Sequence, residues 1–393
     1  MNLVTIKSSH KRLIWCAYLI SLIYGMAYIL PFVIIPTVSI NLHISLELSG
    51  YILTSFILGV IITQFLNGYL VKFISIKSEI LVIFLFFIIF LISGYFCHNY
   101  IFVTLILFLF GLSCGILITL PTYILVNSLK NTDLTREMNI NDFCFSLGTF
   151  ISPYVASKMM NFNNNYILCY LVILIAWIFL IILLRGVSFP ILKEIKIEKQ
   201  TKYSRWNLSV VFVGVAIFLY LISYSGLTYV IPQFLQNQRG FNMIDSVNSI
   251  TIFWLFYCIG CLISSILSKK IPINFYIVIS AIIAIIFFSG LLYSKPLSTI
   301  YIDLAMAGFG CSCIYSSSMS FGSKLVKTPS PRIMSFFLFL SGLGGFVGEM
   351  YSNYMFYRYS FRTVEILTII SLVLSMVIFL AIGIKRKILF KKQ

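Results

Sequence analysis

The chain has 393 residues, of which 60% are hydrophobic and only 10% are charged, and its mean hydropathy is +1.02. Soluble globular proteins do not have this composition. The formal net charge of +17 would suit nucleic acid if the basic residues formed one patch, but they are spread over short connections between apolar runs. We therefore expect a protein of the lipid bilayer with no nucleic-acid partner.

Apolar runs long enough to cross a hydrocarbon core as a helix, about 20 residues each, recur along the whole chain. Strands of a membrane barrel would be shorter and would alternate in polarity. The sequence thus predicts an all-α membrane protein with twelve transmembrane helices, over 13–35, 48–71, 80–97, 100–127, 136–160, 166–186, 207–231, 246–268, 272–294, 298–321, 332–356 and 363–384.

The placement of basic residues predicts the orientation of these helices. Most Lys and Arg residues fall in alternate connections and at both ends of the chain, which are therefore expected to be cytoplasmic. The opposite side holds Lys158, Arg239, Lys295, Arg358 and Arg362. The longest connection is basic and follows the sixth helix. It predicts an N-terminal six-helix bundle at 1–186, a cytoplasmic linker at 187–206 and a C-terminal six-helix bundle at 207–393.

The two halves repeat short phrases in the same order. GMAYILP at 25–31 matches GLTYVIP at 226–232, FGLSC at 110–114 matches FGCSC at 309–313, and LGTF at 147–150 matches LGGF at 343–346. An even number of helices in each half makes these parallel repeats. The arrangement resembles the major facilitator architecture of two six-helix bundles, and glycine in the first phrase predicts close helix approach.

In that architecture the first and fourth helices of each half line a central cavity. This places Tyr24, Tyr28, Tyr224 and Tyr229 where a substrate would meet them, and an aromatic face with a hydroxyl suits a sugar or another polar organic solute. The alternative is that these tyrosines only pack between helices.

Three further stretches, NDFCFSLG (141–148), FWLFYCIG (253–260) and VKTPSPR (326–332), resemble the TsgA family. This is a branch of the major facilitator superfamily similar in layout to the fucose permease group of sugar–proton symporters. The resemblance implies a bacterial inner-membrane transporter. The chain departs from the fucose permease pattern because its first and fourth helices lack Asp and Glu, so that proton mechanism does not transfer directly.

Ionisable side chains within the apolar runs are candidate functional residues, because each costs roughly 2.5 kcal/mol or more to insert at mid-helix. Asp142 lies on one stripe with Ser146, next to Asn141, by helical spacing. A carboxyl held away from water can bind and release a proton near neutral pH. Asp142 is thus our proton-coupling candidate, and a structural hydrogen bond to neighbouring groups is the alternative.

Two other acids and a polar helix complete the candidates. Glu349 is expected towards the outer third of its helix, either in an ion pair with Arg358 or Arg362 or at an outer gate. Asp303 is expected to be solvated or to cap a helix. The run SSSMS at 316–320 permits bending of its helix, and Tyr315 and Ser316 are candidate cavity contacts.

The sequence holds no nucleophile–base constellation, phosphate loop or metal-ligand cluster, so we expect no enzyme, no cofactor and no metal. The predicted function is secondary active transport of a small polar organic solute, sugar-like by preference, with proton symport by alternating access. The alternatives are a uniporter or a proton-antiport efflux carrier and, less favoured, a membrane sensor or scaffold that does not transport. We expect a multi-pass monomer in a bacterial inner membrane.

Overall fold

In the computed structural model of the chain, the described residues are 3–44, 46–71, 73–96, 99–129, 131–162, 166–185, 187, 208–268, 270–326 and 331–391. Within these ranges every regular element is a helix. The first half of the chain contains α1 (Leu3–Asn41), α2 (Leu46–Leu70), α3 (Ile76–Phe96), α4 (Tyr100–Ser128), α5 (Asn131–Phe162), the 3-10 helix η1 (Tyr166–Tyr170) and α6 (Leu171–Leu183).

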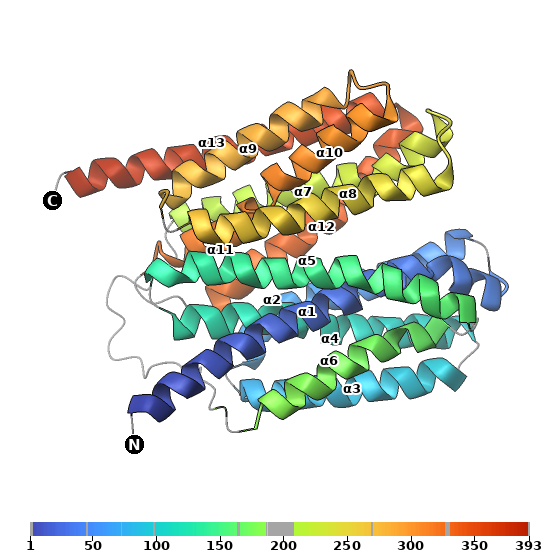
Figure 1. Cartoon of the computed structure of the whole chain (residues 1–393), viewed down its shortest axis with the longest axis horizontal. Helices are drawn as coiled ribbons and strands as arrows, with labels where there is room; N and C mark the ends of the chain where they lie inside the picture. Colours follow the sequence, from blue (N-terminus) through green and yellow to red (C-terminus); the bar gives the residue numbers. More distant parts are fainter. Residues whose placement is uncertain are drawn as a thin grey trace. The chain divides into compact units, whose positions relative to one another are not determined.

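The second half continues with α7 (Leu208–Asn237), α8 (Met243–Leu267), α9 (Ile273–Gly290), α10 (Leu297–Cys311), α11 (Ile314–Ser323), α12 (Pro331–Arg358) and α13 (Phe361–Lys391) (Figure 1). The predicted helix at 298–321 is therefore interrupted. It forms α10 and α11, which are separated at Ser312 and Cys313.

Ten helical stretches in the described residues are long and apolar enough to cross a membrane, and one of them runs through α10 and α11 from Leu297 to Ser323. The other two predicted spans correspond to α5, which carries the polar stripe around Asp142, and to the shorter apolar stretch Ile167–Leu183. Together they account for the twelve membrane-spanning segments predicted from the sequence.

The chain forms two compact units. The first holds α1 to α4, α5 from Cys144 onward, η1, α6 and the beginning of α12 up to Ser335. The second holds α5 up to Phe143, α7 to α11, α12 from Phe336 onward, and α13. The linker expected at 187–206 lies outside the described residues apart from residue 187, and the domain boundaries predicted from the sequence stay a prediction.

The outer surface of the helices is apolar. In α3, Leu85, Ile89 and Ile92 are 60%, 57% and 57% exposed and recur at helical spacing, whereas Ile83 and Phe87 on the opposite face are buried. An exposed apolar stripe of this kind is not stable in water, but it is what a helix facing lipid requires. The chain is a multi-pass membrane protein.

The repeated glycines lie where two helices cross with their backbones in contact. In the second unit, a Cβ added to Gly226 of α7 would lie 2.6 Å from the carbonyl oxygen of Gly348 in α12. In the first unit Gly25 of α1 faces the backbone of Phe145 in α5, and Gly148 faces that of Leu22. Any side chain would force these helices apart, so the sequence prediction of close approach is confirmed.

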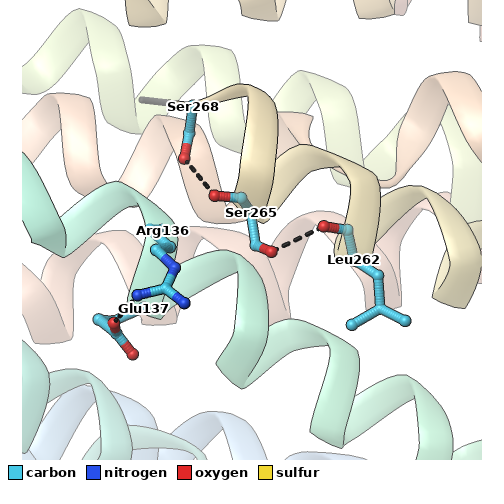
Figure 2. Close-up of polar contacts among 5 residues, drawn as sticks. All are labelled: Arg136, Glu137, Leu262, Ser265 and Ser268. Atoms are coloured by element: carbon cyan, nitrogen blue, oxygen red, sulfur yellow. Dashed lines mark hydrogen bonds and ion pairs between the residues drawn. The ribbon is translucent and has the colours of Figure 1, made fainter. Parts of the chain in front are cut away.

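Polar side chains within the helices are largely satisfied locally. In α8, the Ser265 hydroxyl donates to the carbonyl oxygen of Leu262 at 2.7 Å, and the Ser268 hydroxyl donates to that of Ser265 at 3.0 Å (Figure 2). Near the start of α5, Arg136 and Glu137 form an ion pair at 3.4 Å. Such serines bond back to their own helix and need no ligand.

Candidate functional site

The second unit buries the carboxyl of Asp142 beside hydroxyl and thiol groups of α8. Asp142 is 6% exposed, and the Tyr257 hydroxyl donates to its Oδ2 atom at 3.1 Å. The sulfur of Cys261 lies 4.0 Å from the same oxygen. Tyr257 and Cys261 are four residues apart and share one face of α8. Tyr257 can donate to the carboxylate and accept from the protonated acid, so both states of Asp142 have a partner.

A ladder of polar contacts joins the first part of α5 to α11. The Ser316 hydroxyl donates to Oδ1 of Asn139 at 2.6 Å, and the hydroxyls of Thr135 and Ser320 lie 2.7 Å apart. Lys324 extends the ladder by donating from Nζ to the Thr135 hydroxyl at 3.0 Å. The spacing of four residues on both helices aligns these pairs, and it fixes Asp142 one turn beyond Asn139.

One polar group in this ladder makes no hydrogen bond to the described residues. The Nδ2 atom of Asn139 is buried and has no hydrogen-bond partner among the described residues. A buried amide without an acceptor is costly, of the order of 1–3 kcal/mol. An acceptor oxygen supplied by a bound solute or a water molecule would satisfy it, three residues before Asp142.

Aromatic rings of α7 and α8 surround Tyr257. The ring centres of Trp254 and Tyr257 lie 5.3 Å apart, and those of Tyr224 and Trp254 lie 6.3 Å apart in an edge-on arrangement. Tyr220 continues the group at 5.0 Å from Tyr224. Rings combined with hydroxyl groups provide the apolar face and the polar handle that a small polar organic solute needs.

The interruption between α10 and α11 lies against the same group of side chains. The Tyr220 hydroxyl donates to the carbonyl oxygen of Cys311 at 2.8 Å, and the Cys261 thiol donates to that of Ser312 at 3.2 Å. Carbonyls released where a helix is interrupted inside a membrane protein must find such partners. Cys261 thus contacts both the interruption and Asp142.

Most of the predicted site residues fall into two groups. Asp142, Asn141, Tyr224, Tyr315 and Ser316 belong to the second unit, where Ser316 is buried in the ladder. Asn141 and Tyr315 are half-buried. The hydrogen-bond partner of Asp142, Tyr257, was not among the residues predicted from the sequence.

The other group belongs to the first unit. Tyr24 of α1 stacks on Phe145 of α5 with ring centres 5.2 Å apart, and Tyr28 lies 5.6 Å from Tyr24. Ser146, which follows Phe145 in α5, is fully buried. Tyr24 and Tyr28 thus pack between helices of their own unit, which was the alternative interpretation, and their role in a cavity stays a prediction.

Two further candidates lie in α7 and α12. Tyr229 is 41% exposed and lies near Glu349 and Tyr357. Glu349 is half-buried, and no ion pair links it to Arg358 or Arg362 in the part of the chain that the structure describes. The expected ion pair is therefore not formed, and a gate at Glu349 stays a prediction.

Three acids differ from the sequence analysis. Asp303 was expected to be solvated or to cap a helix, but it lies within α10 and is 8% exposed, where the Ser294 hydroxyl bonds to it and Gly290 leaves room beside it. Glu79 and Glu365 are 4% and 0% exposed and were not considered. The start of α3 at Ile76, a full turn before the predicted boundary, is what brings Glu79 inside the helix.

Within the described ranges no group of three or more His, Cys, Asp or Glu side chains is placed to hold a metal ion. The polar groups of this region are one buried carboxyl with a hydroxyl partner, one buried amide nitrogen without a partner among the described residues, and a set of aromatic rings.

The family model described as Major Facilitator Superfamily matches residues 17–349. Protein TsgA homolog of Buchnera aphidicola subsp. Acyrthosiphon pisum (strain Tuc7) is 23% identical over 337 residues, which cover 85% of this chain and 86% of that protein.

Two transporters of known structure share the fold. FucP in its outward conformation has a TM-score of 0.79 at 16% identity, with 94% of this chain and 98% of FucP covered; another structure names FucP as the E. coli fucose:proton symporter. The proton:xylose symporter XylE has a TM-score of 0.76 at 13% identity, with 94% of this chain and 95% of XylE covered.

Proposed function

Because this chain belongs to the major facilitator superfamily, we propose that it is a secondary transporter that moves a small polar organic solute, sugar-like in character, together with a proton by alternating access. The observation that carries the proposal is the buried Asp142 carboxyl with the Tyr257 hydroxyl on its Oδ2 atom. The printed names of FucP and XylE, which are symporters of fucose and xylose with protons, support the choice of solute and coupling ion.

Asp142 is the proton carrier in this proposal. A charged carboxyl inside a membrane protein is costly, whereas the protonated acid is much less so. Proton binding therefore changes the free energy of the conformation in which Asp142 is shielded from water relative to the one in which it is exposed to water. Tyr257 keeps a hydrogen bond to the side chain in both states. The unused amide of Asn139 and the rings of Tyr224 and Trp254 bind the solute nearby.

The proposed setting is a bacterial inner membrane, with a single chain forming the pathway and both ends in the cytoplasm. The distribution of basic residues supports this orientation, because the side that is then external holds only Lys158, Arg239, Lys295, Arg358 and Arg362. Exposed positive charge concentrates on the cytoplasmic side of such proteins.

The test is proton-coupled uptake in liposomes that contain a trapped pH dye. Sugars, organic acids and nucleosides are added one at a time to the wild type and to Asp142→Asn. We expect one sugar-like solute to acidify the lumen with the wild type, and we expect Asp142→Asn to lose this signal while radiolabelled solute still exchanges.

Exchange of solute without any proton movement in the wild type would instead identify a uniporter. Acidification that persists in Asp142→Asn would show that another group carries the proton. Because Asn keeps the size of the side chain and can still accept from Tyr257, loss of folding is not the expected cause of a lost signal, and the retained exchange serves as the control.

A further inference from the structure

A second group of buried acids lies at the C-terminal end of α9, apart from Asp142. Asp303 of α10 accepts a hydrogen bond from the Ser294 hydroxyl. The same hydroxyl lies 3.1 Å from the carbonyl oxygen of Gly290, the last residue of α9. A Cβ at Gly290 would lie 3.0 Å from Oδ1 of Asp303, so the carboxyl sits directly against the helix end.

Glu365 of α13 completes the group. It is 0% exposed, and neither of its carboxyl oxygens has a hydrogen-bond partner among the described residues. The backbone N–H of Leu292 points toward the carboxyl without forming a well-aligned hydrogen bond, Asp303 lies near it, and Arg239 and Arg362 also act on it. We call Asp303, Glu365, Ser294 and the carbonyl group of Gly290 at the end of α9 the Asp303–Glu365 cluster.

The electrostatics of this cluster are unbalanced. The C-terminal carbonyls of a helix carry partial negative charge and favour a cation, yet two carboxyl groups lie there. Arg239 compensates in part: it is half-buried, donates to the carbonyl oxygen of Ser294 at 3.3 Å and lies 5.2 Å from the centre of the Phe234 ring. Arg362 is exposed, so water screens its charge.

From this arrangement we propose that the Asp303–Glu365 cluster binds a monovalent cation, Na⁺. Two carboxylates and one compensating arginine leave a single negative charge, which one monovalent ion balances. Carboxylate, hydroxyl and carbonyl oxygens are the donors that a hard cation takes, and carbonyls at helix ends coordinate Na⁺ in transporters of other folds. The unpartnered oxygens of Glu365 are the ligands still available.

The test is direct binding of ²²Na⁺ to the purified full chain in nanodiscs at pH 7.5, together with thermal unfolding in NaCl against choline chloride at equal ionic strength. We expect saturable binding of ²²Na⁺ and a higher Tm in NaCl, because a ligand that binds only the folded state stabilises it. Glu365→Gln and Asp303→Asn should each weaken binding of ²²Na⁺ at least about tenfold. A tenfold change in affinity is about 1.4 kcal/mol, and a contact to a charged group contributes about that much.

Glu79→Gln is the matched control, because Glu79 is another buried carboxyl, in the first unit, whose oxygens have no hydrogen-bond partner among the described residues. This variant should bind ²²Na⁺ as the wild type does. Should a carboxyl variant fail to fold, Ser294→Ala tests the same cluster and should weaken binding severalfold.

Three results would overturn the proposal: no saturable ²²Na⁺ binding to the wild type, binding that is unchanged in both carboxyl variants, or stabilisation by lower pH with no effect of Na⁺. The last result would identify a proton as the balancing cation. None of these measurements requires transport, so their outcome is independent of the role proposed for Asp142.

Discussion

Asp142 in the second unit and Glu79 in the first are both carboxyl groups buried inside membrane helices, but their surroundings differ. Asp142 has the Tyr257 hydroxyl at 3.1 Å and the Ser316–Asn139 pair one turn away. Among the described residues neither oxygen of Glu79 has a hydrogen-bond partner, and the neighbouring Asn67 donates an amide hydrogen to Thr119.

The difference shows that burial alone does not identify a proton carrier. A side chain that cycles between charged and neutral states needs partners suited to both, because an unpartnered charge in a protein interior costs several kcal/mol. Asp142 has such a partner in Tyr257, which can donate or accept. Glu79 lacks one within the described residues, so we assign it no part in the transport cycle.

The strongest test of this distinction is to remove the Tyr257 hydroxyl, which is the hydrogen-bond partner of Asp142. Tyr257→Phe removes only the hydroxyl, and a hydrogen bond to a charged group is worth about 1.5–3 kcal/mol. We expect the initial rate of proton-coupled uptake at a fixed pH gradient to fall roughly 10- to 100-fold.

Tyr276→Phe is the control for this change. The Tyr276 hydroxyl is also buried in the second unit and donates to Ser264 at 2.5 Å, but no carboxyl receives it. Its loss should leave uptake near the wild-type rate. Equal losses in the two variants would mean that any buried tyrosine hydroxyl is needed for folding, and the comparison would lose its basis.

A smaller effect is expected from the polar ladder. Ser316→Ala removes the hydroxyl that donates to Asn139 at 2.6 Å, a bond between neutral groups worth about 1 kcal/mol. Uptake should fall about fivefold. Ser317→Ala should change little, since the Ser317 hydroxyl is fully buried and has no hydrogen-bond partner in the part of the chain that the structure describes. Both are measured as uptake of radiolabelled solute, and a greater loss in Ser317→Ala would contradict the ladder.

The smallest effect is expected at Glu79. Glu79→Gln preserves size and polarity, and the amide of the neighbouring Asn67 donates to Thr119, so uptake should stay within about twofold of the wild type. The measurement is the same liposome assay, run beside Asp142→Asn at matched protein content. If Glu79→Gln abolished proton movement as Asp142→Asn is expected to, the number of hydrogen-bond partners would not distinguish carriers from bystanders.

The sequence predicted the fold class and the helix crossings well because both depend on patterns along the chain. Apolar runs set the twelve segments, and the repeated glycine phrase identified Gly25 and Gly226 as positions of close approach. The phrase did not predict that the backbones of Phe145 and Gly348 approach them. A glycine shows where another helix can come close, but not which helix does.

The candidate site was less predictable. Asp142 was found from the cost of a charge in an apolar helix, but Tyr257 is far away in sequence and only the fold brings it near. Asp303 and Glu365 lie close to helix ends, where hydropathy cannot separate a solvated acid from a buried one. The run of serines at 316–320 permitted a bend but did not locate one, because these serines lie inside α11. The helix is interrupted before them, at Ser312, whose hydroxyl bonds back to the Phe309 carbonyl at 2.7 Å.

The thiol that covers this interruption also makes it measurable. Cys261 is fully buried, donates to the Ser312 carbonyl at 3.2 Å and lies 4.0 Å from Asp142, so an alkylating reagent can reach the sulfur only while the interrupted helix or α5 separates from α8. In a variant whose other cysteines are replaced, the rate at which the Cys261 sulfur is alkylated measures how often the helices around it separate. Comparing that rate with and without solute would show whether the interrupted helix moves during each turnover or stays closed throughout.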